Sequence, residues 1–211
     1  MKIILSVFCV VCSAISLMAA DYILKSVQIQ PIESYPAKAT VESITIAADP
    51  YDSDKKAYSA FDVKDLNSRG YFPIHVIIQN RSSDFLIVRT RNIILITSAG
   101  EQLYSTPVTA ILEDIFSPTA IDKLSRAESR KGSKKVKFGT PLSDFTDKDL
   151  TNKLIDPGKV SGGFLFFTNP DAKKAIFTGS TLFIPNIEEE GTRKSIGPFY
   201  IPLSPALSTS K

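Results

Sequence analysis

The sequence predicts a mainly β protein, an antiparallel β-sandwich with a short helical insertion at about residues 107–154. Three observations lead to this class. Apolar and polar residues alternate with a period of two in several short segments, most clearly over residues 71–79. Gly, Pro, Asn and Asp separate these segments at intervals of roughly ten residues. The spacing of apolar residues becomes helical only in the middle third of the chain.

Two strands are expected before the first long connection. The segment "YILKSVQIQPI" (22–32) alternates loosely and predicts a strand that ends near Pro31. The segment "KATVESITIAADPYD" (38–52) alternates more regularly and predicts one β-branched strand that stops at Asp49-Pro50. The polar residues 53–70 then predict a long connection with a short helical turn, closed by Gly70.

The clearest strand is "GYFPIHVIIQN" (70–80), which contains His75, the only histidine of the chain. One face of this strand is apolar and is expected to face the core; it carries Phe72, Ile74, Val76 and Ile78. His75 lies on the other face, which we expect to be a sheet surface. Turn residues at 80–84 and 98–101 separate this strand from strand-like residues 85–97 and 102–108. Such short connections indicate antiparallel pairing.

The middle third predicts two or three short helices. Ile111, Leu112, Ile115 and Phe116 have helical spacing. Ser117-Pro118 has the composition of an N-cap followed by the first helical position. In "SDFTDKDLTNKLIDPG" (143–158), Thr146 and Asp149 have the spacing of a capping box, and Pro157-Gly158 is expected to stop that helix.

Strands return in "KVSGGFLFFTN" (159–169), "STLFIPNI" (180–187) and "IGPFYIPL" (196–203). Gly162-Gly163 indicates a bulge or a close backbone approach at the start of the first of these. Phe164 and Phe166 are expected to face inward and to meet the stripe that runs from Phe72 to Ile78. Residues 206–211 are small and polar and are expected to form a frayed tail.

These elements resemble a known layout. "DVKDLNSRGYFPIHVIIQNRSSDFLIVRTRNIILITSAGEQL" followed later by "IDPGKVSGGFLFF" is similar to exported bacterial immunoglobulin-like β-sandwich domains, in which a Pro-Gly turn precedes a "GFLFF"-type strand. The resemblance covers roughly residues 40–105 and 155–203 and leaves the helical insertion unmatched. It implies an immunoglobulin-like sandwich and no activity, because such domains serve adhesion, binding and structural roles alike.

The first twenty residues predict a secretory signal peptide. Lys2 precedes an uncharged apolar run, and small residues stand just before Asp21. We expect cleavage after Ala20, a mature domain over 21–205 and a periplasmic or extracellular location; an uncleaved membrane anchor is the alternative. The only cysteines, Cys9 and Cys12, lie in this segment, so disulfides, Cys-ligated zinc and a Cys nucleophile are not expected in the mature chain.

The charge of the chain gives little indication of a partner. The formal net charge falls by one, from +3 to +2, when Lys2 is removed, and nothing in this balance favours nucleic acid. The run "RKGSKKVK" (130–137) contains five basic residues in eight and could bind phosphate or anionic lipid. It contains Gly and Ser and lacks interleaved aromatic residues, which favours a solvated loop.

Catalysis is not expected. A serine hydrolase would need His75 as its base, but the chain has no G-x-S-x-G sequence, and zinc would find only His75 and carboxylates. We therefore expect His75 to be a scaffold residue, with no catalytic, cofactor-binding or metal-binding residue.

Two polar patterns have a functional and a structural interpretation. Asp49, Asp52 and Asp54 could bind calcium, but their spacing is not that of an EF-hand, and a solvated turn is favoured. Asn80-Arg81-Ser82 fits a glycosylation sequon, and a turn asparagine explains it equally well.

The sequence thus predicts an exported, non-catalytic sandwich domain that binds an unidentified protein, glycan or cell-envelope surface. The alternatives are a carboxylate-dependent hydrolase and a glycan-binding module. The chain has no Trp for stacking on sugars, although Tyr51, Tyr58, Tyr71 and Tyr104 could substitute.

Overall fold

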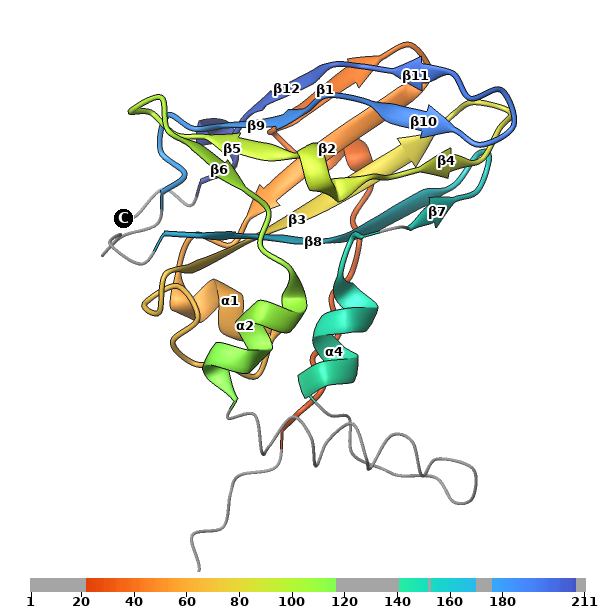
Figure 1. Ribbon diagram of the computed structural model, residues 1–211. Helices are drawn as coiled ribbons and strands as arrows, with labels where there is room; N and C mark the ends of the chain where they lie inside the picture. Colours follow the sequence, from red (N-terminus) through yellow and green to blue (C-terminus); the bar gives the residue numbers. More distant parts are fainter. Residues whose placement is uncertain (1–21, 117–140, 152, 170–175, 208–211) are drawn as a thin grey trace, which may run out of the picture.

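The computed structural model describes residues 22–116, 141–151, 153–169 and 176–207. Within these ranges the fold is mainly β, as the sequence predicts. Its strands form three antiparallel four-stranded sheets that pack as a β-sandwich (Figure 1). The signal-like residues 1–20, the Ser117-Pro118 pair and the basic run 130–137 lie outside the described residues.

The first sheet forms one layer of the sandwich and has the strand order β1-β2-β3-β8. Its strands are β1 (Lys38–Val41), β2 (Ile44–Pro50), β3 (Tyr71–Asn80) and β8 (Val160–Thr168). Strand β3 pairs with β2 on one side and with β8 on the other, each in an unbroken register. Isoleucine, valine and aromatic residues dominate β3 and β8, and such side chains fit a pleated, buried surface.

Two further sheets, ordered β11-β10-β4-β7 and β12-β9-β5-β6, form the opposite layer. Their strands are β4 (Leu86–Ile87), β5 (Ile94–Ile96), β6 (Gln102–Tyr104), β7 (Leu154–Ile155), β9 (Thr181–Ile184), β10 (Ile187–Glu189), β11 (Ser195–Ile196) and β12 (Phe199–Pro202). Pro185 separates β9 from β10, and Pro198 separates β11 from β12. Because proline has no N–H to donate, the hydrogen-bond ladder is interrupted at both places.

The α-helices lie together beneath the first sheet (Figure 1). They are α1 (Asp54–Ala60), α2 (Val108–Ile115) and α4 (Pro141–Lys148); 3-10 turns occur at η1 (Ile32–Ser34), η2 (Thr90–Asn92) and η3 (Ser204–Ala206). The side chain of Ser53 accepts a hydrogen bond from the Lys56 N–H and so caps α1. None of the helices in the described ranges has the length and apolar composition needed to cross a membrane.

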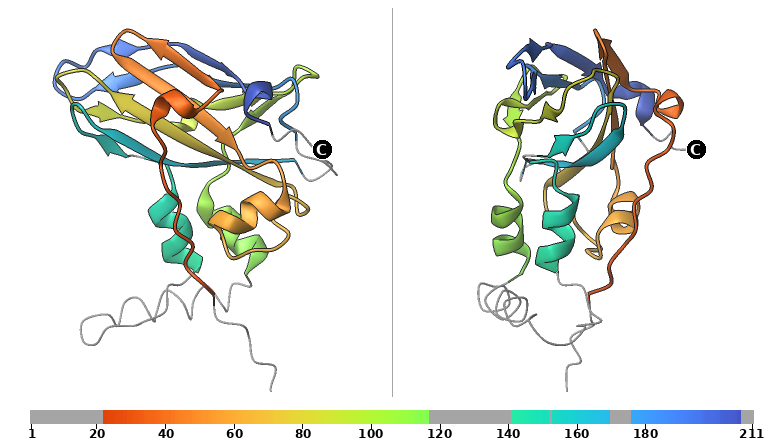
Figure 2. Two further views of the ribbon diagram at one scale, coloured as in Figure 1. Left: turned by 180° about the vertical axis from the view of Figure 1, so that it is seen from behind. Right: turned by 90° about the vertical axis from the view of Figure 1, so that its right-hand side faces the viewer.

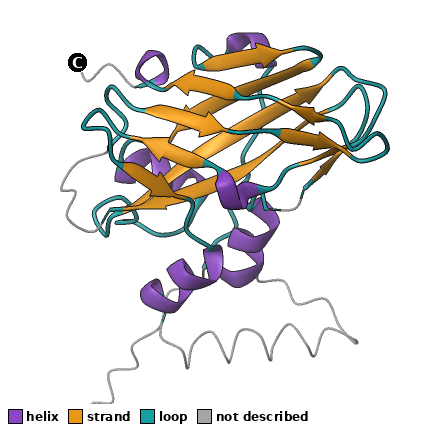
Figure 3. Ribbon diagram, turned by 45° about the horizontal axis from the view of Figure 1, so that its top comes forward, coloured by secondary structure: helices purple, strands orange, loops and turns teal. Residues whose placement is uncertain are grey.

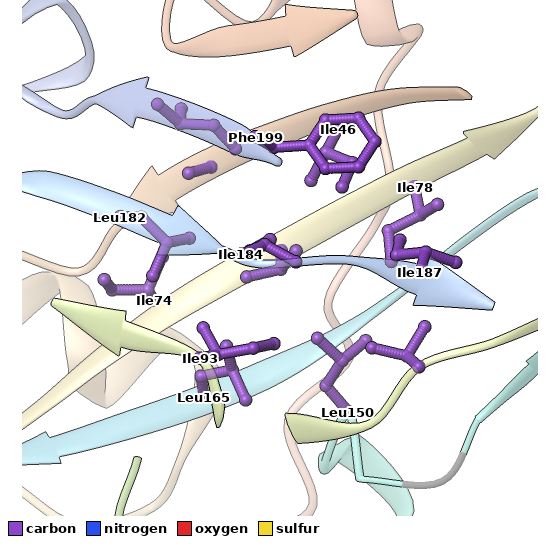
Figure 4. Close-up of a cluster of buried hydrophobic side chains, with 14 of the residues drawn as sticks. Ile46, Ile74, Ile78, Ile93, Leu150, Leu165, Leu182, Ile184, Ile187 and Phe199 are labelled. Atoms are coloured by element: carbon purple, nitrogen blue, oxygen red, sulfur yellow. The ribbon is translucent and has the colours of Figure 1, made fainter. Parts of the chain in front are cut away.

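The main core lies between the two layers (Figure 4). The predicted stripe of β3 forms its centre: Phe72, Ile74, Val76 and Ile78 are all completely buried. Side chains of the second layer meet this stripe, among them Leu182 and Ile184 of β9. The alternation in the sequence therefore assigns this face of β3 correctly.

The expectation for β8 is wrong by one residue. The register pairs Phe72 with Phe167 and Ile74 with Leu165, and directly paired residues point to the same face of a sheet. Leu165 and Phe167 therefore fill the main core, whereas Phe164 and Phe166 point to the opposite face. The sequence "FLFF" is apolar at every position, so its pattern contains no information about which residues face inward.

A second core covers the other face of the first sheet. Phe61, which follows α1, and Phe145 of α4 are completely buried against Phe164 and Phe166. Their ring centroids are 4.4–5.6 Å apart, as in packed aromatic clusters. Strand β3 is consequently buried on both faces. His75 is only 4% exposed, so the expectation of an open sheet surface at this residue is wrong.

Residues 22–31 do not form the predicted strand. They run from the helical end along the outer face of the first sheet and lead into η1 (Figure 2). Side chains, instead of a neighbouring strand, bind this segment: the Tyr22 hydroxyl donates to Asp144 over 2.6 Å, and the Ile23 N–H donates to Asp62 over 2.9 Å. Lys25 forms an ion pair with Asp62 and lies over the ring of Tyr58.

Three local predictions are corrected by the structure. Residues 38–50 form a hairpin and not one strand, because Glu42 adopts a positive φ of 51° and turns the chain. Thr146 and Asp149 do not begin a helix, since α4 ends at Lys148. Pro157-Gly158 is a turn between β7 and β8, in which Gly158 takes a positive φ that glycine adopts at little cost.

Replacing Ile74 by Ala should lower the free energy of unfolding by about 2–5 kcal/mol, because the change removes buried methyl groups and leaves a cavity. Leu154→Ala is the matched control; Leu154 is 49% exposed, and the loss should stay within about 0.5 kcal/mol. Urea unfolding followed by circular dichroism measures both. Equal losses would contradict the core described above.

Candidate functional site

A groove beside the edge of the first sheet is the best candidate site. Strand β8 ends the sheet, so its outer backbone groups need partners. Two chain segments supply them. The Thr106 N–H, after β6, donates to the Phe166 carbonyl over 2.7 Å, and the Leu150 N–H, after α4, donates to the Phe164 carbonyl over 3.0 Å. The groove lies between these two segments, and Leu165 contributes to its lining.

The groove has a cavity volume of about 370 Å³ and is rich in hydroxyl groups. Its lining consists of Thr90, Arg91, Ser105, Thr106, Pro107, Val108, Thr109, Thr146, Asp149, Thr151 and Leu165. A second hollow of about 290 Å³ shares Thr90, Arg91 and Thr151 with it and extends to Arg89 and Asn92. A concave surface with several convergent polar groups is the usual form of a ligand site.

Hydrogen bonds between hydroxyl groups hold the groove in shape. The hydroxyls of Thr90 and Thr151 share a hydrogen bond of 3.1 Å and so connect η2 to the segment after α4. The Thr151 N–H and hydroxyl both donate to the carboxylate of Asp149, over 3.2 and 3.1 Å. The Ser105 hydroxyl donates to the Thr90 carbonyl. The three segments therefore form one preorganised polar wall.

Other polar groups of the groove remain available to a ligand. The side chains of Arg91, Thr109 and Thr146 are exposed and make no hydrogen bond or ion pair with the part of the chain that the structure describes. Arg89, in contrast, is engaged by Glu188 in an ion pair of 2.8 Å. A guanidinium among hydroxyl groups can bind an oxyanion such as a carboxylate or phosphate, since all of these groups can donate hydrogen bonds.

The composition of the groove does not favour catalysis. Asp149 is the one carboxylate among its described lining residues, whereas glycosidases use a pair. A threonine nucleophile would need a stronger base beside it than this carboxylate. The imidazole of His75 lines a different hollow.

His75 lies in a hollow of about 180 Å³ on the outer face of the first sheet. Its ring stacks on Phe164 with centroids 4.7 Å apart and an interplanar angle of 15°. Burial and the positive charges of Lys153 and Lys56 lower the pKa of His75 to about 4. The imidazole is therefore neutral at pH 7 and packs as an aromatic ring. The prediction that it is a scaffold residue remains a prediction.

The two glycines predicted to allow a close approach do so. A Cβ on Gly162 would lie 2.9 Å from the Val76 carbonyl oxygen and 3.0 Å from Nε2 of His75. A Cβ on Gly163 would lie 2.8 Å from the backbone of Leu150. The absence of a side chain at 163 thus lets the segment after α4 reach the edge of β8, which forms one wall of the groove. No bulge is present, since the β3–β8 register is continuous.

Two acids of the segment 49–54 are engaged by protein groups in the described structure. Asp49 pairs with Lys56 over 2.7 Å, and Asp54 accepts hydrogen bonds from the backbone of Asn67 and Ser68. Across the described ranges, no three His, Cys, Asp or Glu side chains converge as metal ligands would. These acids stabilise the start of α1 and the loop that follows it.

Asn80 is a structural residue. It is completely buried, and its side-chain amide donates to the carbonyls of Asp84, Ile155 and Asp156 at 2.8–3.2 Å. The amide nitrogen that a glycan would modify is thus occupied by the contacts that connect the β3–β4 turn to β7. The turn interpretation of this sequon agrees with the contacts.

Of the four tyrosines considered for sugar stacking, only Tyr104 has a widely accessible ring. Tyr51 and Tyr71 are buried in the second core. Tyr58 is covered in part by Lys25. Tyr104 is 63% exposed on the edge strand β6.

Sequence reasoning missed the groove entirely. Thr90 begins η2, Ser105 follows β6 and Thr151 follows α4, and no spacing rule connects these three positions. The local signal is only that each follows or precedes a short apolar strand. The covering of the β8 edge brings them together, and this depends on tertiary packing.

Comparisons with known proteins assign no family to this chain. No protein-family model matches the chain, and no curated protein does. The yjhA protein of Bacillus subtilis superposes with a TM-score of 0.39 at 10% identity, over 71% of this chain and 79% of that one. A functionally unknown protein from Listeria monocytogenes superposes with a TM-score of 0.37 at 11% identity, over 78% of this chain and 79% of its own.

The burial of His75 predicts a specific pH dependence of stability. In the unfolded chain the imidazole becomes protonated as the pH falls below its ordinary pKa of 6.5. In the folded chain it becomes protonated only as the pH falls to about 4. Between these values the unfolded state holds more protons, so this residue's contribution to stability is present above pH 6.5 and is lost as the pH falls. The loss between pH 7 and pH 4.5 should be on the order of 2 kcal/mol.

Urea unfolding of the wild type and of His75→Leu at several pH values tests this. Carboxylates titrate in both proteins, so the difference between the two curves isolates the histidine. Parallel curves would show that the imidazole is accessible to protons in the folded state.

Proposed function

We propose that this chain is an exported, non-catalytic, immunoglobulin-like β-sandwich domain that binds a partner outside the cytoplasm through the hydroxyl-lined groove. The observation that carries the proposal is the convergence of preorganised threonine and serine hydroxyls with Arg91, an arginine that has no partner among the described residues, beside the β8 edge. The groove belongs to segments that are hydrogen-bonded to a sheet edge, and such attachment helps a binding site to hold its geometry.

The chemistry of the groove supports a ligand that carries an oxyanion. Arg91 can form a bidentate pair with a carboxylate or phosphate. The exposed hydroxyls of Thr109 and Thr146 can hydrogen-bond the rest of the same group. Such a group occurs on a peptide side chain, a chain terminus, an acidic glycan or an envelope phosphate.

Export is supported by the leader-like sequence of residues 1–20 and by the absence of cysteine from residues 21–211. The described segment that follows the expected cleavage point is bound to the domain through Tyr22, Ile23 and Lys25. A mature chain that begins at Asp21 would keep all three contacts.

The groove is tested with inorganic phosphate and with small mono- and dicarboxylates as probes. Titration of the ¹⁵N-labelled mature protein should shift the amide signals of Thr90, Arg91 and Thr151. Arg91→Ala should weaken binding of the probes about tenfold or more, because a charge-assisted hydrogen bond contributes about 1.5–3 kcal/mol. Arg81→Ala, an exposed arginine in the β3–β4 turn, is the control and should bind as the wild type. Binding that survives Arg91→Ala would reject the groove as the site.

Export is tested by N-terminal sequencing of the protein recovered from the periplasm or medium of an expressing bacterium. The expected first residue is Asp21. A secreted form that still begins at Met1, or accumulation in the cytoplasm alone, would contradict the proposed export.

A further inference from the structure

The outer face of the sheet β12-β9-β5-β6 carries a row of apolar and aromatic side chains that crosses all four strands. The register pairs Tyr200 with Phe183, Phe183 with Ile94, and Ile94 with Tyr104. Directly paired residues share a face of the sheet. The neighbouring row Ile201, Leu182, Leu95 and Leu103 packs on or against the main core, so the aromatic row points away from it.

This face is accessible to a partner. Tyr200 and Tyr104, at the two ends of the row, are 57% and 63% exposed, and Phe183 is half-buried. Ile94 is covered from both sides by its neighbours. Figure 3 turns the top of the molecule forward, and the α-helices lie below or behind the strands in that view. Exposed aromatic residues gathered in one row mark a contact surface and are unlike singly scattered apolar residues.

The surface is uncharged throughout. The sheet presents eight outward positions in two adjacent rows: Ile94, Ile96, Gln102, Tyr104, Thr181, Phe183, Tyr200 and Pro202. None of them carries a charge, although 22% of the chain consists of charged residues. An uncharged face favours a partner that is neutral where it makes contact, which distinguishes this face from the groove beside Arg91.

The dimensions of the row favour a linear chain over a protein. The ring centroids of Phe183 and Tyr200 are 4.8 Å apart. Phe183 and Tyr104 are two strands apart, which places them about 10 Å from each other. Covering the exposed parts of these rings would bury on the order of 300 Å², well below the roughly 800 Å² per partner of a stable protein–protein interface.

We propose that this row, defined by Tyr104, Ile94, Phe183 and Tyr200 and called the aromatic row, binds an extended neutral polysaccharide of β-1,4-linked sugars. The 4.8 Å between the ring centroids of Phe183 and Tyr200 corresponds to about one sugar unit of such a chain, and the two-strand separation of Phe183 and Tyr104, about 10 Å, corresponds to about two. The flat apolar faces of pyranose rings lie against the aromatic rings, and the hydroxyls at their edges hydrogen-bond to Gln102 and Thr181 of the adjacent row. Tyrosine serves both needs, since it has an apolar ring and a polar hydroxyl.

The test measures depletion of the mature protein from solution by microcrystalline cellulose and by chitin. The wild type should bind at least one of the two. Tyr104→Ala and Tyr200→Ala should each weaken binding about tenfold or more, because each removes one stacking ring. Phe85→Ala removes another exposed aromatic residue, 40% exposed and outside the row, and should bind as the wild type. Unchanged urea midpoints show that the exposed-site variants remain folded.

Three results would overturn the proposal: no binding to either polysaccharide, binding that the row variants leave unchanged, or a concentration-dependent dimer that Tyr104→Ala and Tyr200→Ala abolish. The last would assign the row to a contact between two copies of the chain. Arg91→Ala should not affect binding to polysaccharide. The proposal for the aromatic row and the proposal for the groove can therefore be rejected independently of each other.

Discussion

The structure depends on the burial of the β3–β8 pair on both of its faces. Alternating residues of these two strands supply two cores, one against the second layer of the sandwich and one against the helices. A sheet that is apolar on both faces must be covered on both. The helices and the segment 22–37 meet this requirement, so they are part of the fold and not appendages to an otherwise complete sandwich.

The same constraint produces the groove. Strand β8 is buried on both faces and also ends its sheet, so its outer backbone groups must be satisfied by loops. The segment before α2 donates a hydrogen bond to the Phe166 carbonyl, and the segment after α4 donates one to the Phe164 carbonyl. The glycine at 163 makes room for the segment after α4. Their hydroxyl-bearing residues then stand opposite each other. A groove lined by polar groups is thus a by-product of closing a sheet edge.

The two candidate surfaces differ in chemistry and in origin. The groove is concave and polar and contains the exposed side chain of Arg91, which has no partner among the described residues. The aromatic row is uncharged and lies on a sheet face that the described α-helices do not cover. A domain with both could hold a polymer on the sheet and a charged group in the groove. Neither surface involves His75, whose imidazole is enclosed by Phe164 and its neighbours.

The sequence alone determined the mainly β class, the stripe from Phe72 to Ile78, the helix at 108–115 and the close approach at Gly162-Gly163. Each of these follows from local periodicity or from the absence of a side chain. Tertiary structure decided the inward face of "FLFF", the burial of His75 and the conformation of residues 22–31. Strand pairing also decided that Tyr104, Phe183 and Tyr200 share one row. Alternation says which residues share a face of one strand, but only the packed partner fixes which face is buried and which strands are neighbours.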